Sequence, residues 1–258
     1  MSNEPHPPLP WQFRHQPALV AHRGFAQWFP ENTLTAMAAA VDAGAAFLEC
    51  DIQLSKDGVP FLMHDADLMR TAGIDKSVFD LTMQELATIN VGEPERLGGR
   101  FNVRPTTLEQ LCVHLNQWQN VHTFIEIKRQ SVEHFGLETV MSRVFDAIQT
   151  LVAPFTILSF RNDVVTYTNA HTAFSTGWVI RDWNADSLAQ LDTLKPEFVY
   201  CNYTKIPADL TLPEGPWHWV LYEITDDATA AHWRARGAAM IESMNVGKLL
   251  AGPLLGAP

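Results

Sequence analysis

AHRGFAQWFPENT (residues 21–33) is the stretch that decides the fold class. It follows the apolar run of residues 18–21, which predicts a buried strand, and precedes the alanine-rich run of residues 34–43, which predicts a helix. His22-Arg23 therefore lies at the carboxyl end of a strand, and Glu31-Asn32 lies at the start of a helix. Parallel α/β folds carry their chemistry in loops of this kind, so these residues are the first candidates for a functional site.

The next apolar segment, residues 47–53, predicts a second strand in which Glu49, Asp51 and Gln53 share one face, because strand side chains alternate. Two neighbouring carboxylates in a buried strand repel each other and are costly to desolvate. A bound cation is the simplest compensation. Amide replacement of Glu49 or Asp51 would relieve the repulsion, so we expect either variant to lose activity but to be folded and more thermostable.

Five short motifs follow one another along the chain: HRG (22–24), PENT (30–33), E-x-D-x-Q (49–53), DG-x-P (57–60) and HD followed by L-x-RT (64–71). Each motif alone is weak, but the ordered series is specific. It resembles the glycerophosphodiester phosphodiesterase family, which is related to the phosphatidylinositol-specific phospholipases C. Weaker resemblance extends over nearly the whole chain.

The resemblance implies a metal-dependent enzyme that splits a glycerophosphodiester into glycerol 3-phosphate and an alcohol. His22 and His64 match the family's general acid and base, in an order that the sequence leaves open. A histidine titrates near neutral pH, which suits both tasks. The resemblance also implies that Glu49, Asp51 and Glu126 bind the divalent ion. Glu31 is expected to lie close enough to be a fourth ligand. Hard oxygen donors without cysteine suit Mg²⁺ or Ca²⁺.

Positive and aromatic side chains complete the candidate site. Arg23 and Lys128 match family residues that contact the phosphate, and Asn32, Phe160 and Tyr222 are further candidates for substrate contacts. An alternative for the carboxylates is a barrel interior filled by salt bridges, such as Glu126 with Lys128 or Arg23. Alternative functions are a lysophospholipase D-type or phospholipase-C-like phosphodiesterase or lyase, and a barrel that binds phosphoesters without turnover.

Two segments depart from the family pattern. Residues 222–225 read Tyr-Glu-Ile-Thr where the family typically has Trp-Thr-Val-Asn, and residues 242–245 read Glu-Ser-Met-Asn where a Thr-Asp-x-Pro turn is common. We expect both changes to lie on the barrel rim, away from the motif residues, and to affect the alcohol pocket rather than the phosphodiester chemistry.

The order of predicted elements fits one α/β domain, residues 18–258, folded as a (β/α)₈ TIM barrel. Residues 1–17 predict an extended arm, and residues 72–105 predict a lid-like insertion after the second strand. We expect one capping box inside this insertion, at Thr82–Glu85, and a second one directly after it, at Thr106–Glu109. We also expect one helix over residues 132–151 and a tail over residues 249–258 that packs across the barrel.

Composition limits the partners. The 258 residues carry a net charge of −11, which argues against non-specific binding to nucleic acid or anionic lipid. A small-molecule phosphodiester therefore requires a local positive charge. Three distant cysteines, a polar first segment without a signal-peptide core and no long apolar run predict a cytoplasmic protein without an integral membrane segment. The sequence leaves the oligomeric state open.

Overall fold

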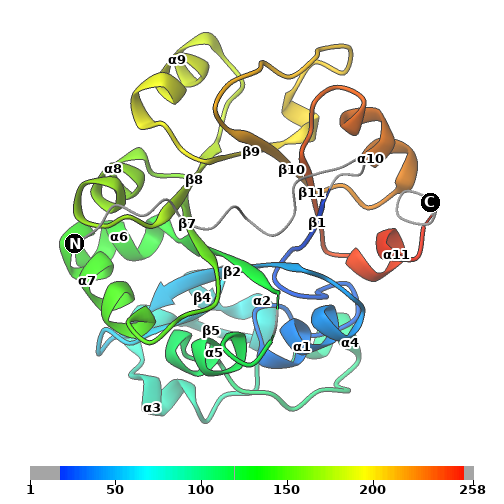
Figure 1. Cartoon of the computed structure of the whole chain (residues 1–258). Coiled ribbons are helices and arrows are strands. Elements are labelled where there is room, and N and C mark those ends of the chain that lie inside the picture. The colour runs from blue at the N-terminus through cyan, green and yellow to red at the C-terminus, as the bar shows by residue number, and fades with distance from the viewer. Residues whose placement is uncertain (1–17, 119, 253–258) are drawn as a thin grey trace.

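The computed structural model describes residues 18–118 and 120–252, so the expected N-terminal arm lies outside it. Within this part of the chain, eight parallel strands form a closed barrel (Figure 1). The barrel closes because the first strand pairs with both the second and the last. In order around the barrel the strands are β1 (Ala18–Ala21), β2 (Phe47–Leu54), β6 (His122–Ile127), β7 (Phe155–Ser159), β8 (Ser175–Ile180), β9 (Phe198–Asn202), β10 (His218–Tyr222) and β11 (Met240–Ser243). The (β/α)₈ fold is confirmed.

Helices surround the barrel (Figure 1). They are α1 (Leu34–Asp42), α5 (Leu108–Leu115), α6 (Arg129–Phe135), α7 (Leu137–Ile148), α8 (Asn162–His171), α9 (Ala185–Leu194), α10 (Asp227–Arg234) and α11 (Val246–Leu250). The connection from β9 to β10 contains only the 3₁₀ turn η2 (Tyr203–Lys205).

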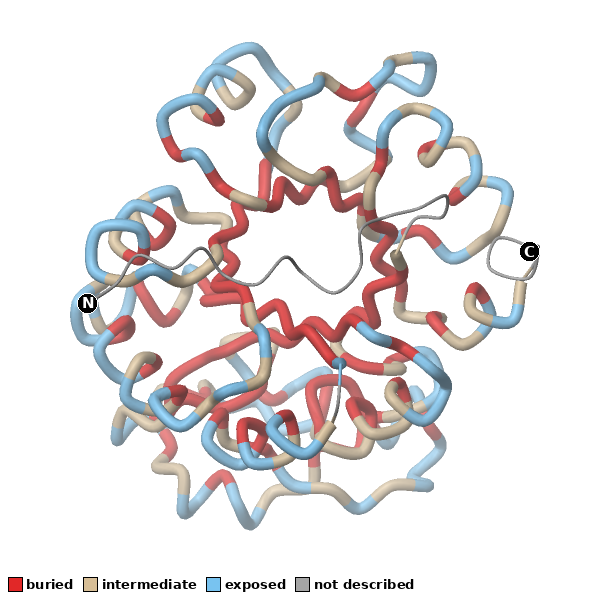
Figure 2. Tube along the Cα trace, in the orientation of Figure 1, coloured by how far each residue is buried: buried red, intermediate tan, exposed pale blue. Residues whose placement is uncertain are grey.

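The barrel strands are buried on both faces, as the continuous red ring in Figure 2 shows. Alternate residues of each strand separate into two apolar cores. Side chains such as Val20, Phe124 and Met240 pack together inside the barrel. Their neighbours along the strands pack against the helices. Because side chains alternate along a strand, the residue two positions after each of these interior residues also points into the barrel. These residues lie at the carboxyl-terminal mouth of the barrel, above the apolar interior.

Three local predictions were wrong in detail. Gly136, with a φ of 83°, separates α6 from α7 where one continuous helix was expected. The capping box before α5 uses Thr107 and Gln110 rather than Thr106 and Glu109. Thr106 is buried instead, and its hydroxyl accepts the N–H of Leu34 (3.4 Å). The expected tail begins inside α11, and residues 253–258 lie outside the description.

The connection after β2 forms a folded unit beside the barrel. The strand β3 (Pro60–Leu62) pairs antiparallel with β2, and the expected insertion follows it. This unit contains β4 (Asp67–Leu68), α2 (Met69–Ala72), β5 (Ile74–Ser77), the 3₁₀ turn η1 (Val78–Asp80), α3 (Met83–Leu86) and α4 (Pro94–Leu97). It has its own apolar core, which includes Phe61, Leu68 and Leu86. The Thr82–Glu85 capping box at α3 is present as predicted.

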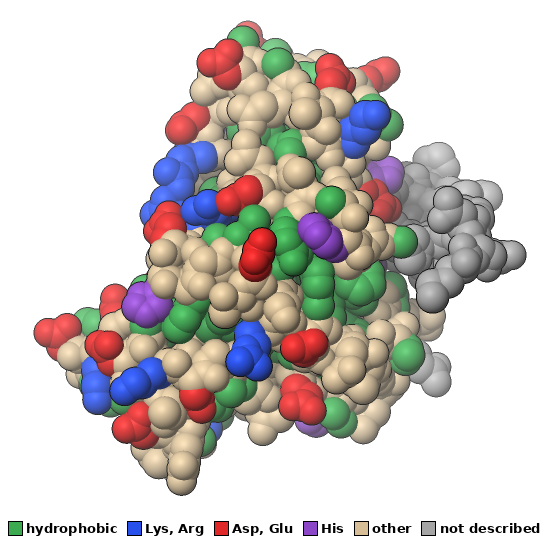
Figure 3. All heavy atoms as spheres, turned by 90° about the vertical axis from the view of Figure 1, so that its left-hand side faces the viewer, with side chains coloured by type: hydrophobic (Ala, Val, Ile, Leu, Met, Phe, Trp, Pro, Cys, Tyr) green, Lys and Arg blue, Asp and Glu red, His purple; other side chains and the backbone are tan. Residues whose placement is uncertain are grey.

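Within the described residues, none of the helices has the length and apolar character needed to cross a bilayer. The three cysteines are buried free thiols. On the face shown in Figure 3, which carries α6, α7 and α8, acidic and basic side chains are interspersed.

His122, at the start of β6, gives a test of the core. It is 2% exposed, its Nε2 lies 2.9 Å from Thr156 Oγ1, and burial lowers its pKa to about 3. The unfolded chain therefore takes up a proton first as the pH falls below about 6.5. We expect this histidine to cost about 1.4 kcal/mol of unfolding free energy per pH unit below that value, or about 2 kcal/mol at pH 5.

Urea unfolding of the wild type and His122→Gln at pH 7 and pH 5 measures this effect. The variant should lose about 2 kcal/mol less than the wild type between the two pH values. Equal losses in the two proteins would contradict the assignment.

Candidate active site

The loop after β1 places its charged residues by an unusual backbone path. Arg23 and Gly24 both have positive φ, 55° and 78°, so the chain turns sharply after His22. A Cβ on Gly24 would lie 2.6 Å from the Ala36 backbone, which explains why only glycine fits there. The turn aims the Arg23 backbone N–H at Glu49 Oε2 (2.9 Å). Thr33 then caps α1 by accepting the N–H of Ala36.

Asp51, on β2, is surrounded by cations and an amide. Its Oδ1 lies 3.1 Å from Lys128 Nζ, and its Oδ2 lies 3.1 Å from Arg23 Nε. Asn32 donates its side-chain N–H to Oδ2 (2.8 Å) and accepts the Asp51 backbone N–H. Burial alone would raise the pKa of Asp51, but Lys128 and Arg23 hold it well below the ordinary value. The amide of Asn32 is thus committed to Asp51.

Glu126 and Glu49 differ in their partners. Glu126 accepts a hydrogen bond from Lys128 Nζ (2.8 Å), so one of the salt bridges considered from the sequence is present. Glu49 is 2% exposed. Within the part of the chain that the structure describes, its polar contacts are the Arg23 backbone N–H and the more distant ring of His22, and its Oε1 has no hydrogen-bond partner. Burial, followed by the charge of Asp51, raises the pKa of Glu49 well above its usual value.

These surroundings give opposite stability effects for two similar changes. At pH 7 without divalent cations, Glu49→Gln should raise the unfolding free energy by about 1 kcal/mol, or about 2–4 °C in melting temperature, because a charge with a raised pKa is removed. Asp51→Asn should lower it by about 3 kcal/mol, because Lys128 and Arg23 lose a buried partner. The structure therefore reverses the expectation from the sequence that Asp51→Asn is more thermostable than the wild type.

Thermal and urea unfolding of both variants in excess chelator measure these differences. Two shifts of the same sign would contradict the pairing described for Asp51.

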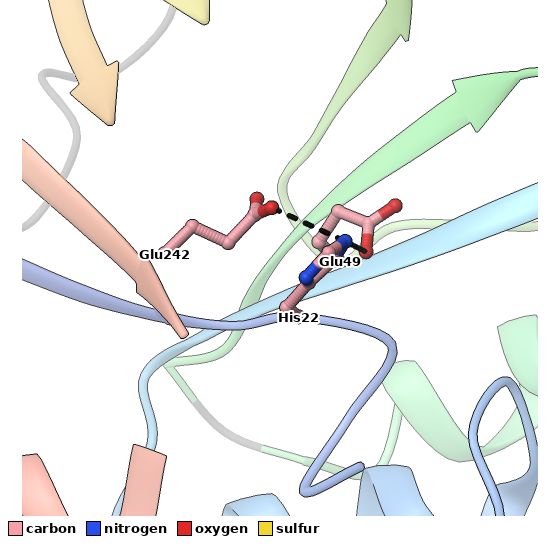
Figure 4. Close-up of side chains that lie close together, drawn as sticks. All are labelled: His22, Glu49 and Glu242. Carbon is pink, nitrogen blue, oxygen red and sulfur yellow. Dashed lines mark ion pairs between the residues drawn. The ribbon is translucent and has the colours of Figure 1, made fainter. Parts of the chain in front are cut away.

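His22 lies between two carboxylates from different strands (Figure 4). Its Nε2 is 3.9 Å from Glu49 Oε2 and 3.5 Å from Glu242 Oε1. Burial lowers the pKa of His22 well below the ordinary value, and Arg23 adds to this effect. The expectation that residues 242–245 lie away from the motif residues was wrong for Glu242. It occupies the inward position two residues beyond Met240 on β11.

The second histidine is held by a chain of polar contacts. His64 Nδ1 lies 2.6 Å from Asp65 Oδ1, and Arg70 Nε donates to Asp65 Oδ2 (2.7 Å). The bond with His64 lowers the pKa of Asp65 to about 2, and Arg70 contributes to the shift. The side-chain amide of Gln53 donates to the His64 backbone carbonyl (3.2 Å). His64 Nε2 is therefore the ring nitrogen that remains available for proton transfer.

Glu31 and Glu93 join this chain of contacts to the insertion. Arg70 donates two bonds of 2.7 Å to Glu31, and Arg23 donates a third of 3.1 Å. Glu93 accepts the Glu31 backbone N–H (2.8 Å) and two hydrogen bonds from the Nε–Nη2 edge of the Arg96 guanidinium. Both Glu31 oxygens are engaged, and Glu31 belongs to neither group of acidic side chains that lies close enough to share a cation.

Comparison with known proteins identifies the family of this chain. A family model described as the glycerophosphoryl diester phosphodiesterase family matches residues 22–223. The chain belongs to this family. A bovine glycerophosphodiester phosphodiesterase 1 is 30% identical over 192 residues, which cover 72% of this chain and 54% of the relative. A mouse glycerophosphoinositol inositolphosphodiesterase is 43% identical over 86 residues, 30% of this chain and 16% of the relative. The chain thus spans about half or less of these relatives' length.

Among solved structures, a phosphodiesterase of Oleispira antarctica in complex with the product sn-glycerol-3-phosphate superposes with a TM-score of 0.82 at 19% identity. The alignment covers 94% of this chain and 98% of that one, which supports the barrel fold of this phosphodiesterase-family member.

Two aromatic side chains border the mouth in this family member. Phe160 and Tyr222 are half-buried and pack against the apolar interior of the barrel. Lys128 Nζ lies 5.9 Å from the Phe160 ring centroid, so the ring contacts the phosphate-binding candidate by a cation–π interaction.

Proposed function

We propose that this protein hydrolyses glycerophosphodiesters to glycerol 3-phosphate and an alcohol, with a divalent cation and with His22 and His64 as general acid and base. The observation that carries the proposal is the convergence of both histidines on one charged cluster. Asp65, Arg70 and Glu31 link His64 to Arg23, which contacts Asp51 through its side chain and Glu49, beside His22, through its backbone N–H. Two histidines at one barrel mouth serve proton transfer, whereas a barrel that only binds phosphoesters does not require them.

Glu49, Asp51 and Glu126 fit a cation site. One ligand atom from each lies within 4.8 Å of the others, a spacing that suits Mg²⁺ or Ca²⁺ with oxygen ligands at about 2.0–2.6 Å. The buried Glu49 Oε1 without a partner is the feature that a cation would satisfy. Such an ion would neutralise the phosphate and stabilise the charge that develops on it. Glu31, proposed from the sequence as a fourth ligand, is instead engaged by Arg23 and Arg70.

The chain's own cations suit the phosphate. Lys128 is 5% exposed and Arg23 is largely buried. Burial alone would lower the pKa of both side chains, but the negative charge of Asp51 contributes most to holding both pKa values above their ordinary values. Both therefore remain protonated at any working pH. An arginine fork and an ammonium held at fixed positions bind phosphate oxygens with little reorganisation.

Water or the substrate itself supplies the nucleophile in this proposal. Ser159 is the nearest hydroxyl at a strand end, but it donates to the Ile127 carbonyl (2.8 Å) and accepts the Arg161 N–H. We propose that the glycerol 2-hydroxyl attacks the phosphorus while one histidine takes its proton. The bond from phosphorus to the alcohol oxygen breaks, and the other histidine protonates that oxygen. Water then attacks the phosphorus of the cyclic phosphate and the bond to the glycerol 2-oxygen breaks. One histidine takes the proton from the water and the other protonates the 2-oxygen, which gives glycerol 3-phosphate. Proximity favours such an intramolecular attack by roughly 7–11 kcal/mol.

Glycerophosphocholine is the first substrate to test. We expect glycerol 3-phosphate and choline, detected by a coupled glycerol-3-phosphate assay. Glycerol and phosphocholine instead would indicate the phospholipase-C-like alternative, towards which the mouse inositolphosphodiesterase relative points. Turnover of lysophosphatidylcholine alone would indicate a lysophospholipase D-type enzyme. Binding without any product would indicate a non-catalytic barrel.

The attacking group is tested with a substrate that lacks the glycerol 2-hydroxyl, a propanediol phosphodiester with the same choline leaving group. We expect it to compete with glycerophosphocholine but to react at least 10³-fold more slowly, because the intramolecular nucleophile is absent. Hydrolysis at the ordinary rate would show that water attacks directly.

A further inference from the structure

Glu242 is a buried carboxylate that none of the family motifs accounts for. It lies on β11 and is 3% exposed. Its Oε1 is 3.5 Å from His22 Nε2, and its Oε2 has no hydrogen-bond partner among residues 18–118 and 120–252. In the described part of the chain, no Lys or Arg nitrogen lies within 4 Å of it. An isolated buried charge of this kind is costly, so a ligand is the expected compensation.

Glu242 and Glu49 lie on the two strands that flank β1. β11 and β2 both pair with β1, and Val20 of β1 pairs with Glu242 and with Phe47, two residues before Glu49. The carboxylates on β2 and β11 therefore extend into the barrel mouth from either side of β1, as Figure 4 shows. One atom each from His22, Glu49 and Glu242 lie within 4.8 Å of one another.

Charge pairing separates these two carboxylates from their neighbours. Asp51 and Glu126 already hold Lys128 between them, at 3.1 and 2.8 Å. Glu49 and Glu242 have no such partner, and each keeps one buried oxygen without a hydrogen bond. A cation bound at this mouth would gain most by contacting the two unpaired carboxylates.

We propose that Glu242 is a ligand of the divalent cation and binds it together with Glu49. The inference rests on the cation dependence proposed above and adds a ligand from the last barrel strand. The cation would share Glu49 between Glu242 and the group formed with Asp51 and Glu126. It would also neutralise the charge of Glu242, which has no Lys or Arg partner among the described residues.

Calorimetric titration of the chelator-treated, dialysed full chain with Ca²⁺ or Mg²⁺ alone tests this. Glu242→Gln should weaken the dissociation constant at least tenfold relative to the wild type. It should also reduce the rise in melting temperature that the cation produces. Glu223→Gln is the matched control, because Glu223 is exposed, acts on Glu242 only through its charge and loses the same charge. It should bind within twofold of the wild type.

Wild-type affinity in Glu242→Gln would overturn the inference and leave the proposed function standing. So would normal cation binding combined with an altered pH–rate profile, which would show that Glu242 positions His22 instead. An equal loss in Glu223→Gln would show a long-range charge effect and would also overturn it. If the wild type binds neither cation, both the inference and the cation dependence fail.

Discussion

Alanine at His22 or His64 is expected to lower the turnover of glycerophosphocholine by about 10²–10⁴-fold in each variant. The two histidines move protons in the same step, so removing either one leaves that step without its acid or its base. The double variant should be little worse than the poorer single variant, because residues that act as a unit are not additive. Steady-state rates of the three variants with glycerophosphocholine measure the effect.

His171 and His134 are matched controls. His171 is exposed on α8, its Nδ1–H donates to the Tyr167 backbone carbonyl (2.8 Å), and its ring stacks on the Tyr167 ring. His134 is exposed on α6 and stacks on Phe79. Alanine at either position should leave turnover within about twofold. A loss at His171 as large as that at His64 would show that the catalytic histidines have been misassigned.

Removal of divalent cations is expected to have an effect of similar size. In excess chelator, turnover should fall at least 10³-fold, because Glu49 and its neighbours then repel the anionic phosphodiester and the phosphate loses its strongest counter-charge. Adding Mg²⁺ or Ca²⁺ in excess of the chelator should restore the original rate.

Circular dichroism of the chelated protein separates this effect from unfolding. The barrel should remain folded, because its apolar interior and the Asp51–Lys128 pair do not depend on the ion. Undiminished turnover in chelator would exclude the cation site.

Residues at the ends of apolar strands were the predictable part of the site. His22, Glu49 and Asp51 follow or occupy strands whose alternation is plain in the sequence, and the structure brings them together with Glu126 and Lys128. Local patterns such as the strand β2 and the capping box at α3 were predicted for the same reason, since they depend on neighbours in the chain.

Contacts between distant segments were not predictable from local patterns. Glu242 was noticed only as a departure from the family, because its inward direction depends on the register between β11 and β1. The role of Glu93 depends on a left-handed backbone, with a φ of 49°, and on Arg96 one helical turn later. The division of α6 from α7 depended on Gly136, which a helix can also tolerate in its interior.

Pairing of β1 with β11 also determines when the candidate site can first form. During synthesis the strands emerge in order, and β1 has only β2 as a partner until the last strand has left the ribosome. His22 and Glu242 belong to these first and last strands, so they can meet only when that long-range pairing forms, typically a slow step. A nascent chain that lacks β11 has an open edge beside its half-built charged site. The contact between His22 and Glu242 therefore requires the whole barrel to have been translated.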